Sequence, residues 1–481
     1  MATSSPRQRR VLDLPIRLDR SIRIQGQQVH DAIRSAIIDG LLAPGTILPS
    51  SRSLAEQIGV RRNTVVTAYE RLLSDGLIEA RHGAGTYVAT ELPAPPLAAP
   101  AGGNHIEQPK RRAFALGHTY AGSELLRRLA GNVRRRITAA GPDELGYGDP
   151  RGSEYLRAQI AHHLATHRGV RCDASCILVV NGTQHGLRLC LDALLSQGDA
   201  VWLEDPGYYA ARNTLQAAGL RVVPVPVDTE GIIVSAGQRL FGSAKAAYVT
   251  PSHQFPTGVA MSMGRRVALL EWARSSGAWI IEDDYDSEFR YAGPPLTALA
   301  GIGGERVIYI GTFTKVLFAG LRLAYIVVPP SLLEQLVAAR AAHDRFPARF
   351  MQDAVADLMA DGALAAHTRR MRRRYREARD VVAAALHDAA GGALRIAVPK
   401  QGLHLLALLP EGLPEDAAMS IRKAAAVETK LLSGTRIAQS GADGFILGFS
   451  GHDSMELAAA AYRLGQAARD YLAIGNAPRA G

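Results

Sequence analysis

One stretch of the chain separates it into two parts. Residues 90–113 read TELPAPPLAAPAGGNHIEQPKRRA and combine many Pro, Ala and Gly residues with no apolar periodicity. Such a composition is typical of an extended, semi-rigid linker. Because the chain has 481 residues and 47% of them are hydrophobic, each side of this linker is long enough to bury its own core. We therefore predict two domains, residues 14–89 and residues 114–475.

The first domain has the pattern of three short helices. Val29, Ile33 and Ile37 are spaced as one face of a helix. A second helix is predicted over residues 50–59, which begin with serines that can cap a helix and end on a glycine. A third is predicted within residues 60–76. The apolar stripe expected to face the core consists of Val65, Val66, Tyr69, Leu72 and Leu73.

The beginning of the third helix is basic and polar, since Arg61, Arg62, Asn63 and Thr67 fall outside the stripe. Residues 76–89 then predict a two-stranded hairpin with a Gly-rich tip. Two helices joined by a tight turn, the second with a basic first turn, suit insertion into a DNA major groove, and the hairpin would be a wing. The alternative is a small helical interaction domain whose arginines are only solvated.

The stretch LPSSRSLAEQIGVRRNTVVTAYERLLSDGLIEARHGAGTYV strongly resembles the winged helix-turn-helix of the GntR family of bacterial transcription regulators. The resemblance implies double-stranded operator DNA as a partner and places Arg52 and Arg62 at phosphates or guanine edges. Arg61 stands where the family usually has a capping Ser or Thr, and it can offer a phosphate contact instead. The predicted DNA-binding residues are Arg52, Arg61, Arg62, Asn63, Thr64, and, at the wing tip, His82 and Gly83.

Charge and composition limit the partners and the compartment that we expect for the protein. The net charge of +10 and the pI near 9.6 favour a polyanionic partner without requiring one. Because the chain has neither a long uncharged apolar run nor the apolar core of a signal peptide, we expect a cytoplasmic protein with no membrane partner. The three cysteines lack the paired spacing of a zinc site and are predicted to be reduced packing residues.

The second domain alternates apolar strands with amphipathic helices, which is typical of an α/β fold with a largely parallel sheet. Within it, Lys315 is one of few lysines in an arginine-rich chain. It follows a strand predicted over residues 307–310 that breaks at Gly311, and ligands of α/β sheets bind at the carboxyl ends of strands. Since an amine can lose its proton and add to a carbonyl, Lys315 is a candidate nucleophile rather than a surface charge.

Other polar residues also follow predicted strands. The backbone N–H groups of residues 182–184 would point from a helix N-terminus at an anion. Tyr208 could stack on a planar ligand, Asp283 could keep a pyridine nitrogen protonated and Tyr285 could bond a phenolic oxygen. The Arg322 guanidinium could complete the anion site. Because no histidine is near this acidic strand end in the sequence, we predict no metal.

These features form a complete site for pyridoxal 5'-phosphate. They also resemble, in the same order, the fold-type-I aminotransferases, whose Schiff-base lysine matches Lys315. The resemblance implies that Tyr147 reaches the phosphate of a neighbouring subunit in a homodimer. The predicted cofactor-binding residues are Gly182, Thr183, Gln184, Tyr208, Asp283, Tyr285, Thr312, Thr314, Lys315, Arg322 and Tyr147.

A GntR-type winged helix joined to an aminotransferase-like domain resembles the MocR subfamily of transcription regulators, and TPSHQFPTG at residues 250–258 is similar to that subfamily's site loop. Two departures, Ala319 for a usual proline and Ala324 for a usual glycine, could shift the loop that carries Arg322. We predict a regulator that senses pyridoxal phosphate or its adduct with an amine or amino acid. The alternatives are a working aminotransferase with an appended DNA-binding domain, and a domain that serves only for dimerisation.

Two stretches bear on these alternatives. Aminotransferases usually hold the substrate carboxylate with an arginine in a strand that matches residues 445–450, where Ile446 stands in its place. Arg212 or Arg436 could substitute, so whether the chain is an enzyme is left open. The second stretch, residues 365–380, holds seven arginines and is either a second DNA-binding surface or, as we favour, a solvated helix face anchored by Met371 and Tyr375.

Overall fold

The computed structural model describes residues 16, 25–81, 83–92, 112–438 and 441–475. The chain separates into two compact units, residues 1–109 and 110–481. Most of the predicted linker, residues 93–111, lies outside the described residues. Within the described ranges, no helix combines the length and the apolar character that a membrane span requires.

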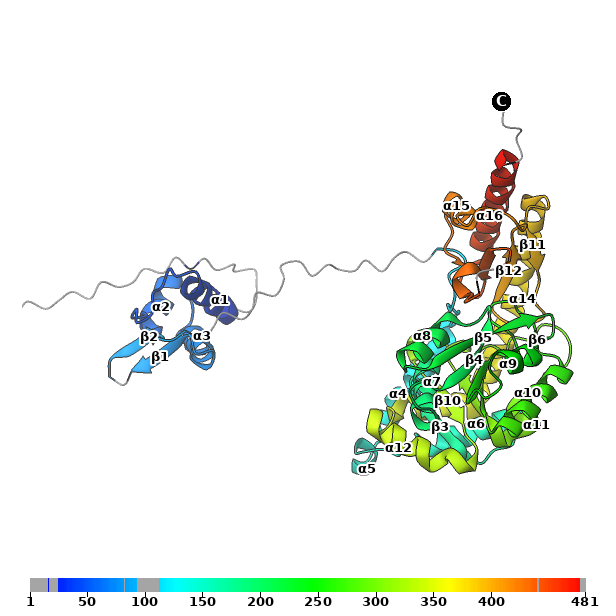
Figure 1. The fold of residues 1–481 in the computed structure, drawn as a ribbon. Helices are drawn as coiled ribbons and strands as arrows, with labels where there is room; N and C mark the ends of the chain where they lie inside the picture. The colour runs from blue at the N-terminus through cyan, green and yellow to red at the C-terminus, as the bar shows by residue number, and fades with distance from the viewer. Residues whose placement is uncertain (1–15, 17–24, 82, 93–111, 439–440, 476–481) are drawn as a thin grey trace, which may run out of the picture. The chain divides into compact units, whose positions relative to one another are not determined.

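The first unit is a three-helix domain with a hairpin (Figure 1). Its core is lined by Val29, Ile33 and Ile37 from the first helix. Its elements are α1 (Gln25–Ile38), α2 (Ser51–Ile58), α3 (Arg62–Ser74), β1 (Ile78–Arg81) and β2 (Gly85–Val88). Ser50 caps α2 by accepting a hydrogen bond from the Ser53 N–H, whereas Arg61 at the beginning of α3 makes no side-chain cap.

The predicted stripe of α3 is partly wrong. Val65, Tyr69 and Leu72 are buried, but Leu73 is 40% exposed and Ala68 takes its place in the core. Val66 is only half-buried. Both α1 and α2 pack against α3, and the side of α3 that they cover carries Val65, Ala68, Tyr69 and Leu72, so the edge of the predicted stripe is left to solvent.

The second unit is built on an eight-stranded sheet in the order β3-β10-β9-β8-β7-β4-β5-β6. The five strands from β9 to β5 run parallel, whereas β10 and β6 are antiparallel to their neighbours. The strands are β3 (Ile177–Val180), β4 (Ala200–Asp205), β5 (Arg221–Asp228), β6 (Gly231–Ile232), β7 (Ala246–Val249), β8 (Trp279–Asp284), β9 (Val307–Thr312) and β10 (Ala324–Val327).

Helices cover both faces of this sheet, as alternate residues of β4 show. Val201 and Leu203 pack on one side with residues of α7, α8 and α12, and Trp202 packs on the other with residues of α9 and α10. The helices in this part of the unit are α4 (Ser123–Thr138), α5 (Pro142–Leu145), α6 (Glu154–His167), α7 (Thr183–Leu194), α8 (Tyr209–Ala217), α9 (Val234–Phe241), α10 (Met263–Ser276), α11 (Leu299–Gly303), α12 (Leu333–His343) and α13 (Arg349–Ala360).

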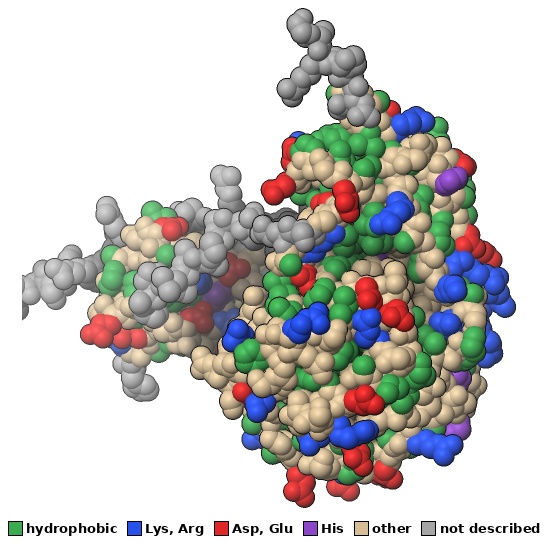
Figure 2. Space-filling model, turned by 45° about the vertical axis from the view of Figure 1, so that its right-hand side comes forward, with side chains coloured by type: hydrophobic (Ala, Val, Ile, Leu, Met, Phe, Trp, Pro, Cys, Tyr) green, Lys and Arg blue, Asp and Glu red, His purple; other side chains and the backbone are tan. Residues whose placement is uncertain are grey.

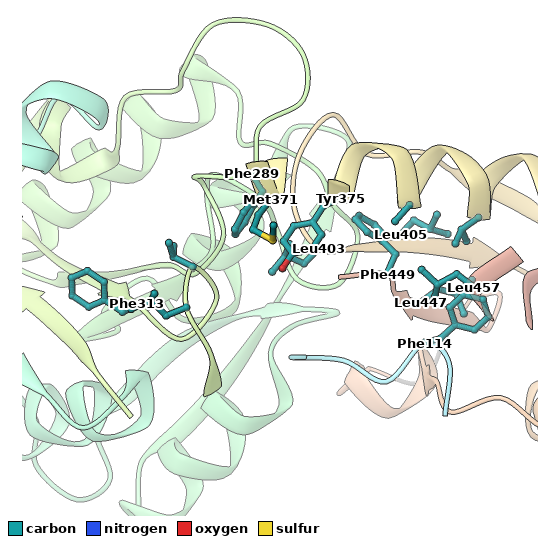
Figure 3. Packing of buried hydrophobic residues seen from close by; sticks show 14 of the residues in the cluster. Phe114, Phe289, Phe313, Met371, Tyr375, Leu403, Leu405, Leu447, Phe449 and Leu457 are labelled. Carbon is teal, nitrogen blue, oxygen red and sulfur yellow. The ribbon is translucent and has the colours of Figure 1, made fainter. Parts of the chain in front are cut away.

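The C-terminal part adds a small antiparallel sheet in the order β11-β12-β14-β13, and α14 and α16 pack together beside it (Figure 1). Met371 and Tyr375 face inward from α14, and Tyr375 meets the Phe289 ring edge-on at 5.1 Å (Figure 3). The predicted anchoring of α14 is therefore confirmed. The elements are α14 (Ala363–Ala390), β11 (Arg395–Ala397), β12 (His404–Leu408), α15 (Ala417–Ala425), β13 (Lys430–Leu431), β14 (Gly444–Gly448) and α16 (Ser454–Gly475).

The strand before Lys315 is longer than predicted. β9 continues through Gly311 to Thr312 instead of breaking at the glycine. A Cβ on Gly311 would lie 2.3 Å from the Tyr325 ring of the neighbouring strand, so the glycine is needed for close packing inside the sheet. The three cysteines are free, in agreement with the prediction.

Candidate functional site

Lys315 lies in the turn that directly follows β9, at the carboxyl end of the parallel strands. Its Nζ would be 3.3 Å from a Cβ on Gly117, which has φ +82° and arrives from the segment before α4. Burial lowers the pKa of the Lys315 amine, and the nearby carboxylates of Asp286 and Asp283 oppose that effect. Burial thus makes this amine easier to deprotonate than an exposed lysine, as a nucleophile requires.

Asp283, the second-last residue of β8, is buried with one oxygen free. The Tyr248 hydroxyl, on neighbouring strand β7, donates a hydrogen bond to Asp283 Oδ2. Oδ1 has no hydrogen-bond partner among the described residues. Burial raises the pKa of this carboxyl to about 7. A buried, half-satisfied carboxylate is costly by itself and suits a cationic N–H donor from a ligand.

An anion cradle lies at the N-terminus of α7. Gly182 is the cap residue and has φ +102°, a conformation that side chains other than glycine rarely adopt. The Arg322 guanidinium lies 3.3 Å from the position of a Cβ on Gly182. The first turn of α7 begins at Thr183 and has no side-chain cap, so this guanidinium lies close to a helix N-terminus, and the two departures near Arg322 have not moved it away.

The side chains of four other predicted cofactor-binding residues contact neighbouring residues. Gln184 Oε1 accepts a hydrogen bond of 2.5 Å from Thr214 Oγ1, and its buried Nε2 has no partner within the described ranges. The Tyr208 ring is held edge-on by Phe255 at 5.5 Å. The hydroxyls of Thr312 and Thr314 are 2.9 Å apart. Burial raises the pKa of Tyr208 to about 12, so it stays neutral.

Tyr285 is tied to a buried histidine pair. Its hydroxyl donates to the His253 carbonyl at 2.9 Å and lies 3.2 Å from His253 Nδ1, which also contacts Asp286 Oδ2 at 2.9 Å. The ring of His404 is 4.9 Å from that of His253, and burial lowers the pKa of His404 to about 3. The premise that no histidine accompanies the acidic strand end was therefore wrong, because the loop of residues 250–258 brings one in.

Tyr147 stands apart from the residues above. It is 81% exposed and packs edge-on against Phe346, with the Arg345 guanidinium 5.6 Å from its ring centroid. No contact within the described ranges joins it to Lys315 or to the anion cradle.

The predicted DNA-binding residues gather at the beginning of α3 and on α2. Arg52 is exposed and lies 3.4 Å from Glu56, and Arg62 Nε donates to Ser51 Oγ at 3.4 Å. Arg61 and Asn63 are exposed and Thr64 is half-buried. Gly83 is exposed in the hairpin turn with φ +71°, and His82 lies outside the described residues.

The position at which aminotransferases usually have a carboxylate-binding arginine is apolar in this chain. Ile446 on β14 is fully buried in a cluster with Phe255, Leu406 and Leu432, and Tyr208 packs against this cluster. The Arg212 guanidinium donates to the Arg436 carbonyl at 3.0 Å. That of Arg436 donates to the carbonyls of residues 441 and 442. Both candidate substitutes are thus already bonded to backbone oxygens.

Two families match separate parts of the chain. The family of bacterial regulatory proteins, gntR family, matches residues 25–88, and aminotransferase class I and II matches residues 120–440. A probable rhizopine catabolism regulatory protein, MocR, of Rhizobium meliloti is 36% identical, covering 89% of this chain and 90% of the relative. The chain belongs to the MocR subfamily of GntR-type transcription regulators.

Other MocR-type relatives agree with this assignment. The pyridoxine biosynthesis regulator PdxR of Corynebacterium glutamicum is 33% identical over 89% of this chain and 92% of its own. Among solved structures, the Thermus thermophilus α-aminoadipate aminotransferase LysN, complexed with N-(5'-phosphopyridoxyl)-L-leucine, is 28% identical with a TM-score of 0.68, covering 76% of this chain and 93% of that one. The chain is thus a DNA-binding transcription regulator with an aminotransferase-like domain of fold type I.

Three residues of the MocR-type site were not found from the sequence. Tyr248 stood out only as a tyrosine in an otherwise aliphatic strand, and its bond to Asp283 depends on β7 lying beside β8. His253 lies in the loop of residues 250–258, but the sequence predicted no partner for it. His404 is the first residue of β12, and nothing local in the sequence connects it to residues 250–258.

Proposed function

We propose that the second unit binds pyridoxal 5'-phosphate at Lys315. Three features support a fit: the free Oδ1 of Asp283, the glycine-lined cradle beneath Arg322 and the amine of lowered pKa. Asp283 would keep the pyridine nitrogen protonated, Tyr285 would bond the phenolic oxygen, and the α7 N-terminus with Arg322 would hold the phosphate. When bound, this cofactor supplies an aldehyde carbon that forms an imine with primary amines.

We propose further that this regulator senses the cofactor, or its adduct with an amine or amino acid, and changes how the winged helices bind operator DNA in the cytoplasm. The observation that carries the proposal is that an aminotransferase class I and II domain and a gntR-family DNA-binding domain are joined in one chain. The test is the affinity of the full chain for operator DNA with and without pyridoxal phosphate and a panel of amines. The proposal would be contradicted if no combination of pyridoxal phosphate and amine changed either the affinity for the operator or the footprint on it.

Transamination turnover is expected to be negligible. Because Ile446 cannot supply a bidentate guanidinium, an amino acid loses a charge-assisted contact worth roughly 1.5–3 kcal/mol, and with it the orientation that proton transfer needs. We expect spectral changes with some amines and no accumulating keto acid. Sustained product formation faster than about 1 per second, an ordinary enzymatic rate, would favour the alternative of a working aminotransferase.

Arg62→Ala is expected to weaken binding to operator DNA by roughly 1–3 kcal/mol, because a guanidinium at the beginning of α3 can contact a guanine edge. The operator can be selected from a random duplex pool with the wild-type protein. Arg71→Ala, at the other end of the same helix, is the matched control. An equal loss on operator and random duplexes would instead make Arg62 a phosphate contact.

We also propose a homodimer in which Tyr147 serves the partner's site. The 81% exposure of this side chain and the two half-sites that paired winged helices usually bind support it. Sedimentation of the full chain should give twice the mass of one chain. A monomer at micromolar concentration would contradict the proposal.

A further inference from the structure

The arginines of α14 are arranged on the outer face of an anchored helix. The buried side of α14 includes Met371 and Tyr375, as described above. Arg369, Arg373 and Arg376 are spaced by four and three residues, so they share one face, and all three are exposed. At about 1.5 Å per residue, the row from Arg369 to Arg376 is roughly 10 Å long.

Most of the seven arginines in residues 369–379 of α14 have no acidic partner. Arg372 Nε donates to the Glu288 carbonyl at 2.9 Å, Arg374 lies over the Tyr120 ring and Arg379 contacts Asp380. The side chains of the other four make no hydrogen bond or ion pair with any residue that the structure describes: Arg369, Arg370, Arg373 and Arg376. Like charges three and four positions apart repel each other and destabilise a helix. Such a row therefore has a cost that a bound polyanion would remove.

The distribution of charge along the chain points to the same partner. Residues 1–109, the first unit, contain twelve arginines, no lysine and ten acidic residues, so the DNA-binding unit has an excess of only two positive charges. Residues 369–379 alone contain seven arginines and one acidic residue. Figure 2 shows basic side chains gathered along the right-hand edge of the larger unit. The long-range attraction for DNA is thus concentrated outside the domain that contacts the bases.

We propose, in place of the solvated face that the sequence favoured, that the exposed arginine row of α14, Arg369, Arg373 and Arg376, is a second contact surface for the phosphate backbone of duplex DNA. It supplies affinity without sequence preference, while the winged helices supply register and base contacts. Duplex DNA carries about one charge per 1.7 Å of its axis, so a row of this length faces several phosphates. The proposal rests on DNA binding by the winged helices and not on the cofactor.

The test uses the full chain and a random-sequence duplex, because phosphate contacts need no operator. The slope of log affinity against log salt is measured for wild type and for Arg369→Ala/Arg373→Ala/Arg376→Ala. Each lost phosphate contact should reduce the slope by about 0.9, so we expect a reduction of roughly 2–3 and at least about a tenfold loss of affinity at low salt. The corresponding triple lysine variant should keep most of the slope, since a point charge still contacts phosphate.

The matched control is Arg239→Ala/Arg274→Ala/Arg395→Ala. These exposed arginines lie on α9, α10 and β11 of the same unit, and their side chains make no hydrogen bond or ion pair with a described residue. The control removes the same number of positive charges. Equal losses of affinity and salt slope in both triple variants would show that only the net charge matters, and would overturn the proposal. A changed sedimentation mass of the α14 variant would also overturn it, because the row would then be a contact between copies of the chain. If wild type bound no DNA, the winged-helix function itself would fail.

Discussion

Lys315→Ala should abolish the covalent attachment of pyridoxal phosphate. Lys315 directly follows β9, which pairs with the strand that carries Asp283, and burial lowers the pKa of its amine, which eases formation of the unprotonated form that adds to an aldehyde. Alanine has no group that can form an imine. Lys315→Arg should fail equally, because a guanidinium keeps its proton and its charge.

The measurement is the mass of each variant after incubation with the cofactor and reduction with borohydride, together with its visible absorbance. Wild type should gain one phosphopyridoxyl group and lose its visible colour on reduction. Lys245→Ala, at an exposed position before β7, is the control and should behave as wild type. A reducible adduct at another residue in Lys315→Ala would show that the site is assigned wrongly.

Asp283→Asn should weaken cofactor binding roughly 10- to 150-fold. An amide cannot keep the pyridine nitrogen protonated, so the variant loses a charge-assisted hydrogen bond worth roughly 1.5–3 kcal/mol. Fluorescence or absorbance titration with pyridoxal phosphate measures the change. Glu282→Gln is the matched control, because Glu282 is an equally buried acid on the same strand that bonds the N–H groups of Leu299 and Ala300. Comparable losses in both variants would mean a general effect on folding.

The same variant should alter the pH dependence of stability in the cofactor-free protein. The folded pKa of Asp283 is about 7, above the ordinary value of 3.8, so between these values the folded state holds a proton that the unfolded state releases. The Asp283 contribution to the free energy of unfolding therefore falls as pH rises from about 4 to about 7. Melting temperatures measured across this window should decline less with rising pH in Asp283→Asn than in wild type. Parallel curves would contradict the raised pKa.

Local periodicity accounts for much of what the sequence predicted. The helices of the first unit, the strand before each site motif and the inward side of α14 follow from spacings of two or of three to four residues, which depend only on neighbours along the chain. Because parallel strands end at one edge of a sheet, Asp283 and Lys315 could also be placed together without knowing the full strand order. These features were determined by the sequence itself.

Contacts between distant segments were decided only by the tertiary structure. The bond from Tyr248 to Asp283 depends on β7 pairing with β8, and the approach of His253 to Asp286 depends on a loop folding over the strand end. The extension of β9 through Gly311 depends on where the Tyr325 ring lies. The pKa of Asp283 follows from its burial, which is a property of the assembled unit. Spacing along the chain holds no information on such pairs, because they form only when helices and sheets pack together.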